Sequence, residues 1–253
     1  MAIVRDEHPQ TPALVLFAHH DDEFFIAATL KKMAQRGPAA AVWLTRGGLH
    51  GRLRQAESRR AMDILGVPRR ALFEIGLPDN HLIDYLEDAV RRLARLMAAY
   101  RPASVIVPAF EGGHLDHDSL QLAAAAAIRR TNWGVNQHPP LYEFPLYHRS
   151  GRRLAVGEFL PGPARTIFTP LKLKDRVLKQ KLARIYSSQK MILYPMLAFR
   201  GGPMMLHRRG EPYRLVSAGR NYTKPPHSGR LAYQFYTRRK FSEFASAAAM
   251  NYK

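Results

Sequence analysis

Up to about residue 130, short apolar runs alternate with segments of helical periodicity, and this alternation constrains the fold more than any other feature. The apolar runs predict strands over residues 13–18, 40–45, 71–75 and 104–108. The segments that follow them predict helices over residues 23–37, 54–66, 82–100 and 117–130. Alternating strands and helices favour a parallel sheet with right-handed crossovers, and continuous apolar runs are typical of a sheet covered on both faces. We therefore predict an α/β fold, a Rossmann-like, doubly wound, mostly parallel sheet flanked by helices, with a C-terminal elaboration.

The pattern is looser beyond residue 140. A strand over residues 141–147 is interrupted by a proline, a helix is predicted over 170–186, and RLAYQFY (230–236) alternates like a strand. The simplest organisation is a single domain over residues 1–253, with a core at about 10–190 and a C-terminal extension over 191–253 that packs on the core or near the site. Aromatic residues of this region are expected in the core rather than on a base-stacking platform: Tyr213, Tyr222, Tyr233, Phe235 and Phe241.

The charge of the chain is strongly positive. Its 253 residues include 39 Lys and Arg against 20 Asp and Glu, which gives a formal net charge of +19 and attracts phosphates, nucleic acid or an anionic membrane surface. The predicted helix over 170–186 has one cationic face, expected to be a solvated surface, with anionic lipid or a phosphate-bearing substrate as the alternative contact. That face consists of Lys172, Lys174, Lys179, Lys181 and Arg184.

The chain contains no cysteine, which excludes disulfides, thiolate zinc sites and a cysteine nucleophile. Any transition-metal site must therefore be built from His, Asp and Glu. The N-terminal residues lack the pattern of a signal peptide, and no apolar run approaches the roughly 18 residues of a membrane span. The expected location is cytoplasmic, with peripheral contact at the inner membrane face as an alternative.

Two clusters of imidazole and carboxylate groups follow predicted strands. Residues 19–23 (HHDDE) come directly after the first strand, and residues 111–118 (EGGHLDHD) come after the fourth. In a sheet of order 3-2-1-4 these strands are neighbours, and ligands bind in the crevice at their carboxyl ends. A His at a strand end and a carboxylate three residues later can face one ion, with His117 as a third ligand. A further carboxylate beside the ion would accept a proton from the attacking water.

Each cluster also has an ordinary structural interpretation. Asp21 or Asp22 would suit the N-terminus of a helix as a cap, and His114 or His117 alone could be a hydrogen-bonded loop residue. The combination of His-x-x-Asp after one strand and His-x-x-His after its neighbour favours a metal site. Zn²⁺ is the expected ion, with Fe²⁺ or Co²⁺ as alternatives.

These two motifs resemble those of the PIG-L/LmbE-type zinc deacetylases, which remove acetyl groups from N-acetylglucosamine-containing substrates. The Ala-His-Pro-Asp-Asp-Glu motif of that family stands here as AHHDDE (18–23), and its His-x-Asp-His motif as HLDH (114–117). The resemblance implies that His19, Asp22 and His117 bind the metal and that Asp21 is the general base. It further implies that His114 stabilises the oxyanion or assists the leaving amine, with Asp116 orienting it.

Supporting likeness extends over most of residues 13–190, through segments 54–67, 72–80 and 179–189. Within them, Arg54 and Asp79 match positions that contact substrate in relatives. One departure is His20, which stands where the family has proline. We expect its side chain to point to solvent or to a backbone carbonyl rather than to serve as a fourth ligand.

The loop TRGGLHGR (45–52) matches no phosphate-binding motif, and its glycines are expected to form a turn beside the site. Its polar residues Arg46, His50 and Arg52 are candidate substrate contacts.

The sequence therefore predicts a metal-dependent hydrolase that removes the N-acetyl group from an N-acetylated amino sugar, as a small molecule or linked to lipid or nucleotide. The alternative is hydrolysis of another amide or an ester on an anionic substrate. The third hypothesis is a basic protein that binds nucleic acid or membrane and carries a vestigial metal site. It ranks third because both clusters keep every ligand-type residue that the chemistry requires, so nucleic acid is not the expected partner.

Overall fold

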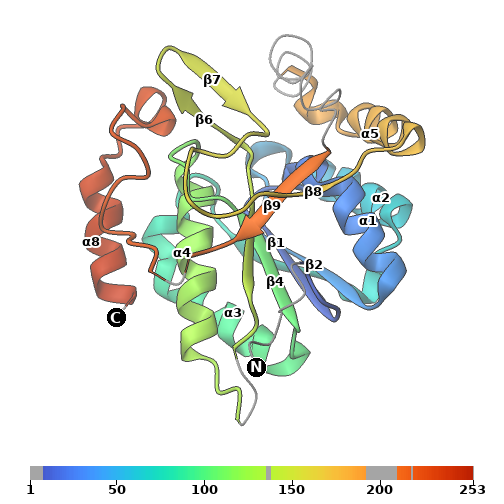
Figure 1. Ribbon diagram of the computed structural model, residues 1–253, viewed down its shortest axis with the longest axis horizontal. Coiled ribbons are helices and arrows are strands. Elements are labelled where there is room, and N and C mark those ends of the chain that lie inside the picture. The colour runs from blue at the N-terminus through green and yellow to red at the C-terminus, as the bar shows by residue number, and fades with distance from the viewer. Residues whose placement is uncertain (1–7, 135–137, 192–209, 218, 253) are drawn as a thin grey trace.

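The four predicted N-terminal strands lie side by side and form one half of a single sheet. The computed structural model describes residues 8–134, 138–191, 210–217 and 219–252, and their main sheet has the order β3-β2-β1-β4-β5-β9-β8 (Figure 1). The strands are β1 (Ala13–Phe17), β2 (Ala39–Thr45), β3 (Leu72–Leu77), β4 (Ser104–Pro108), β5 (Leu141–Phe144), β8 (Ile167–Thr169) and β9 (Glu211–Leu215). From β3 to β5 neighbouring strands are parallel, whereas β9 and β8 pair antiparallel at the edge. The prediction of a mostly parallel, Rossmann-like sheet is confirmed.

The central strands are apolar along their whole length because both faces of the sheet are covered. All five residues of β1 and all seven of β2 are buried. Side chains of β1 alternate between two hydrophobic clusters, with Leu14 and Leu16 in one and Val15 and Phe17 in the other. This double coverage explains why the strand segments read as continuous apolar runs.

Helices cover the two faces in two groups (Figure 1). One group packs α1, α2 and α5 together, and the other packs α3, α4 and α8 together. Their bounds are α1 (Ala27–Arg36), α2 (Gly51–Leu65), α3 (Leu86–Tyr100), α4 (Leu115–Arg130), α5 (Leu173–Ile185) and α8 (Phe241–Asn251). Short 3₁₀ helices precede several of them: η1 (Asp22–Ile26), η2 (Gly48–His50) and η4 (Leu82–Tyr85). Among the described residues, no helix is long and apolar enough to cross a membrane.

The C-terminal half departs from the sequence predictions. The strand predicted over 141–147 is divided at Pro145 into β5 and the first strand of a separate hairpin, β6 (Tyr147–Ser150) and β7 (Arg153–Val156). The strand predicted over 230–236 is wrong, because a 3₁₀ helix, η7 (Ala232–Phe235), lies there. Backbone contact between Ala232 N–H and Gly112 O, at 2.7 Å, fixes this segment against the loop before α4. Residues 192–209 of the predicted extension lie outside the described residues.

Two predictions about exposure also need correction. Tyr213, Tyr222 and Tyr233 are buried as predicted, and Phe241 is partly buried against the core, but Phe235 is 51% exposed. On α5, Lys179 is fully buried rather than solvated: its Nζ donates to Glu211 Oε1 at 2.6 Å and to Phe24 O at 2.7 Å. The remaining cations of the predicted basic face, Lys172, Lys174, Lys181 and Arg184, are exposed.

Candidate metal centre

The loop that follows β1 is closed by one of its own carboxylates. Asp22 Oδ2 accepts the backbone N–H groups of Ala18 and His19, each at 2.9 Å. This arrangement folds the chain back on itself at the end of the strand. It leaves Asp22 Oδ1 directed at His117 Nε2, 3.1 Å away.

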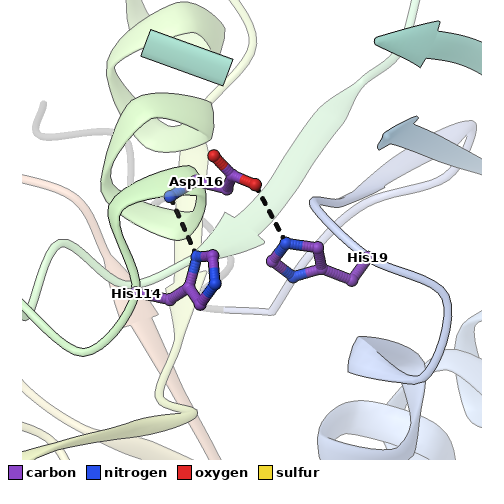
Figure 2. Close-up of side chains that lie close together, drawn as sticks. All are labelled: His19, His114 and Asp116. Carbon is purple, nitrogen blue, oxygen red and sulfur yellow. Dashed lines mark hydrogen bonds and ion pairs between the residues drawn. The ribbon is translucent and has the colours of Figure 1, made fainter. Parts of the chain in front are cut away.

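The loop that follows β4 leads into α4 with a histidine as its N-cap. His114 has an extended backbone, and its Nδ1 accepts the N–H of Asp116 at 3.1 Å (Figure 2). Because Nδ1 is the acceptor, the neutral imidazole of His114 carries its proton on Nε2. Burial lowers the pKa of His114 well below its usual value, which favours this neutral form.

Because β1 and β4 are adjacent, the two loops meet, and three side chains converge. His19 Nδ1 lies 3.2 Å from His117 Nε2 and 3.9 Å from Asp22 Oδ2. The three side chains are buried, and each offers one ligand atom within 4.8 Å of the other two. Ligand atoms on a tetrahedral zinc with bonds of about 2.0–2.2 Å lie roughly 3.3–3.5 Å apart, so this cluster has the chemistry and the spacing of a zinc site.

Asp116 supports the cluster from behind. His19 Nε2 donates to Asp116 Oδ2 at 3.0 Å (Figure 2), and the same carboxylate accepts the N–H groups of Asn80 at 2.6 Å and Leu82 at 3.0 Å. Its carboxylate therefore orients His19, and its backbone N–H is the group that contacts His114, so the role of Asp116 in orienting His114 stays a prediction. Asp116, His19 and His114 form a second geometrically feasible ligand group, but the protein's own donors already occupy that carboxylate.

Charges in the cluster are strongly coupled. Burial disfavours the charged form of His19, but its hydrogen bonds to the carboxylates of Asp116 and Asp22 outweigh this effect and raise its pKa to about 10. Burial opposes ionisation of Asp116 also, yet His19 and His114 hold its pKa at about 2. Carboxylates that attract a proton to this imidazole attract a divalent cation in the same way, so metal and proton would compete.

Asp21 adjoins the cluster without belonging to it. Its backbone has φ of 124°, a conformation that residues other than glycine rarely adopt. Two contacts hold it there: its N–H donates to Glu23 Oε2 at 3.0 Å, and Arg54 Nη2 donates to its Oδ1 at 3.1 Å. Burial raises the pKa of Asp21 to about 7, despite the opposing charge of Arg54.

We did not predict the buried network around Glu23. Its carboxylate is fully buried and accepts from Trp43 Nε1 at 3.2 Å and from Tyr186 OH at 2.8 Å, in addition to the N–H of Asp21. Two features of the sequence could have indicated this network: the third acid in the run after β1, and the YSSQ segment (186–189). Glu23 therefore joins α5 and β2 to the strained residue of the site.

The expectation for His20 is wrong. Its ring is 1% exposed and stacks on Trp43, with ring centroids 5.1 Å apart and an angle of 22° between planes. Neither ring nitrogen has a hydrogen-bond partner among the described residues. Burial lowers its pKa to about 3, with a further contribution from the charge of Arg54.

A cavity of about 250 Å³ opens over the cluster. It is lined by His19, Asp21, Asp22, Phe25, Arg54, Asp79, Asn80, His114, His117, Leu146, Tyr147 and Gln189. Arg54 and Asp79 lie there as the sequence suggested, and Gly47 N–H donates to Asp79 Oδ1 at 2.9 Å. Arg46, His50 and Arg52 instead line a separate cavity of about 620 Å³ along η2 and the start of α2. Phe25, Asn80, Leu146, Tyr147 and Gln189 were not predicted.

Known proteins share the sequence pattern and the fold. Residues 14–128 match the PIG-L family, described as GlcNAc-PI de-N-acetylase. The zinc-inhibited form of teicoplanin deacetylase Orf2 has a TM-score of 0.61 and 15% identity, over 82% of this chain and 99% of that chain. An N,N'-diacetylchitobiose deacetylase from Pyrococcus horikoshii has a TM-score of 0.56 and 18% identity, over 85% and 87%. The 4-carboxy-2-hydroxymuconate hydratase GalB from Pseudomonas putida KT2440 has a TM-score of 0.55 and 17% identity, over 87% and 99%.

Proposed function

Because residues 14–128 belong to the PIG-L family, we propose that this protein is a metal-dependent hydrolase that removes the N-acetyl group from an N-acetylated amino sugar or its conjugate. The observation that carries the proposal is the buried convergence of His19, Asp22 and His117 beneath a cavity that also exposes Asp21. Deacetylases are among the solved structures that share the fold. In the reaction the amide C–N bond breaks, the oxygen of water joins the carbonyl carbon, and the amine leaves with a proton.

Zinc is the ion that we propose for the cluster. His19 Nδ1, Asp22 and His117 Nε2 would hold it, and the cavity that these residues line would admit the substrate beside them. Such an ion polarises a carbonyl and lowers the pKa of water to about 7. Asp116 would hold His19 in the ligating tautomer by accepting from its Nε2.

Asp21 is the proposed general base. Its carboxylate lines the cavity beside the metal ligands, and its raised pKa suits proton transfer near neutral pH. Arg54 binds one of its oxygens and also donates to the carbonyl of His20, at 2.8 Å. The other oxygen of Asp21 is then free to accept the proton of the attacking water.

His114 is the proposed donor to the developing oxyanion. Its Nδ1 is occupied by the N–H of Asp116, so the proton on Nε2 is the one available to a bound substrate. Its ring lies 4.5 Å from that of His19, at an angle of 75°, which places it beside the metal ligands. A neutral donor of this kind stabilises the negative charge that forms on the carbonyl oxygen, as oxyanion-hole donors do.

Two substitutions at adjacent carboxylates test the proposal. Asp22→Ala should lose bound zinc and acetate release together, whereas Asp21→Asn should keep the metal and lose turnover by about 10²–10⁴-fold. Metal analysis of the purified proteins and an acetate assay on N-acetylglucosamine conjugates provide the two measurements, with Asp63→Asn, on an exposed ion pair of α2, as the control.

Full acetate release by Asp21→Asn would exclude Asp21 as the base. If the wild-type protein binds zinc but releases a different acyl group, the proposal of an acetyl substrate would be replaced by hydrolysis of another amide or an ester.

A further inference from the structure

An exposed aromatic ring outside the metal cavity makes cation–π contacts with two arginines. Phe235, in η7, is 51% exposed, although a phenyl ring would ordinarily be buried. The guanidinium carbon of Arg149, on the hairpin strand β6, lies 4.2 Å from the ring centroid, and that of Arg230 lies 4.1 Å from it. Both distances are short for a cation–π contact, so the ring fixes two cations that approach from separate segments of the chain.

Phe235 is next in sequence to Tyr236, whose ring packs against a residue that lines the metal cavity. Tyr236 follows Phe235, and its ring centroid is 5.8 Å from that of His114. Tyr236 OH donates to Gly113 O at 2.9 Å, and it is hydrogen-bonded to Tyr147, which lines the cavity. The hairpin and the segment before α8 lie at the same end of the molecule (Figure 1), so they form one rim.

The two arginines lack acidic partners within the part of the chain that the structure describes. The remaining contacts of their guanidinium groups are with backbone carbonyls: Arg149 donates to Gly151 O and Arg230 to Gln234 O, each at 3.0 Å. Arg54, which lines the cavity itself, contrasts with them because it binds two carboxylates. Two guanidinium groups that share one ring and have no acidic partner among the described residues leave positive charge that favours the binding of an anion beside them.

The size of the cavity indicates that the anion would be a substituent of a substrate too large for the cavity alone. At about 250 Å³ the cavity is below the roughly 300–1,000 Å³ of pockets that enclose a drug-sized ligand, so it suits a single sugar. The remainder of a larger substrate must extend outside the cavity. Phe235 adjoins Tyr236, whose ring lies 5.8 Å from that of His114, so a substituent on this side would approach the ring of Phe235 and its two guanidinium groups.

We propose that Arg149, Arg230 and Phe235 form an anion subsite, which binds a phosphate or carboxylate substituent on the amino sugar whose N-acyl group enters the metal cavity. This assignment rests on the proposed deacetylase function, since it names the substrate class of the same site. Guanidinium groups bind both anions through paired N–H donors, and the ring reduces the freedom that each arginine would lose on binding.

Matched substrates test the subsite. The probes are N-acetylglucosamine 1-phosphate, its 6-phosphate, N-acetylmuramic acid as the carboxylate, and neutral methyl N-acetylglucosaminide. At least one anionic probe should exceed the neutral probe in kcat/KM by on the order of tenfold. Arg149→Gln/Arg230→Gln should abolish that preference and leave the neutral probe within about twofold, because the metal cavity is unchanged.

The control removes the same charge elsewhere on the rim. Arg152 and Arg238 are exposed and lie near the subsite residues in sequence, but among the described residues the cation–π contacts of Phe235 are with Arg149 and Arg230. Arg152→Gln/Arg238→Gln should therefore keep most of the anionic preference. If both double variants lost the anionic preference equally, the preference would come from the overall positive charge of the +19 chain, and the subsite would be overturned. A wild-type protein that prefers no anionic probe would overturn it as well.

The role of the ring has its own test. Phe235→Leu should lower the anionic preference by a few-fold, and Phe235→Tyr should restore it, since only an aromatic face fixes both guanidinium groups. Because Phe235 is exposed, neither substitution should change the unfolding midpoint measurably. A leucine variant with the full preference would remove the ring from the proposal.

Failure of the subsite can be separated from failure of the enzyme. If no probe releases acetate, the proposed function fails, and calorimetry of the sugar phosphates on the zinc-loaded Asp21→Asn protein still measures binding. Adding Arg149→Gln/Arg230→Gln to that protein should weaken the binding of the preferred phosphate by about tenfold. Unchanged binding would overturn the subsite on this measurement alone.

Discussion

The two walls of the site differ in how their charges are satisfied. On the inner wall, formed by the loops after β1 and β4, Asp22 and Asp116 each accept several donors from the protein itself. On the outer rim, Arg149 and Arg230 contact only a ring and backbone carbonyls among the described residues. The inner wall is therefore fixed before any substrate arrives, whereas the rim keeps binding capacity for a ligand.

This difference separates chemistry from recognition. Groups that handle a metal and a proton must be held in one geometry, which saturated hydrogen bonding provides. Groups that choose among conjugates can vary without disturbing that geometry. We therefore expect substitutions on the inner wall to change stability, metal affinity and turnover, and substitutions on the rim to change substrate preference alone.

The largest effect on stability should come from the buried ion pair behind the inner wall. Lys179→Met leaves the carboxylate of Glu211 buried with only the donors of Ala28 and Thr29. Loss of one partner of a buried pair costs about 3–5 kcal/mol, to be measured as the free energy of unfolding in urea. Lys181→Met, on an exposed lysine of the same helix, should change it by less than about 0.5 kcal/mol. Equal values for the two variants would show that the pair contributes no stability.

Lys179 also shows where sequence reasoning stops. Local alternation predicts a parallel sheet, and in the common order 3-2-1-4, which the structure has, both metal motifs lie at strand ends that meet. A lysine on a basic helix is usually solvated, and nothing local indicates a partner 32 residues away in β9. The strand predicted over residues 230–236 was wrong for a similar reason. A short alternating run is compatible with a strand, and only a contact with a distant loop determines that it forms a turn of helix instead.

The next effect concerns metal affinity. Asp116→Asn keeps one of the two oxygens, which now accept separately from Asn80 N–H (Oδ2) and Leu82 N–H (Oδ1), and it removes the charge that faces His19. Loss of such an outer carboxylate lowers metal affinity by about 10–100-fold. A zinc titration in competition with a chelator measures this affinity, with Asp88→Asn, in a partly exposed ion pair of α3, as the control. An unchanged affinity would assign Asp116 to structure alone.

His20 is the exception on the inner wall, and it should make stability depend on pH. Its pKa is about 3 in the folded chain and about 6.5 when unfolded, so between these values the unfolded chain binds the extra proton. Stability is therefore fully present above pH 6.5 and falls as the pH decreases, by about 2 kcal/mol between pH 7 and 5. His20→Leu removes this group, so the difference in unfolding free energy between the two proteins should change by that amount. If the unfolding free energies of the two proteins changed with pH in parallel, His20 would not be the source of the pH dependence.

The smallest predicted effect tests whether the inner wall depends on its distant supports. Tyr186→Phe removes the hydroxyl that donates to Glu23 Oε1 at 2.8 Å, while Glu23 continues to hold the N–H of Asp21. One hydrogen bond of this kind contributes about 1 kcal/mol, so we expect stability to fall by that amount. We also expect kcat to fall a few-fold with KM unchanged, because Asp21 is positioned less firmly.

Tyr100→Phe is the matched control, since the hydroxyl of Tyr100 is buried and has no hydrogen-bond partner among the described residues. Its removal should leave kcat unchanged and stability equal or slightly higher. If Tyr186→Phe lowers stability but not kcat, Glu23 holds the fold without positioning Asp21. In that case the strained backbone of Asp21 must be maintained by Arg54 and the turn of η1, and the contact at the end of α5 contributes to stability but not to turnover.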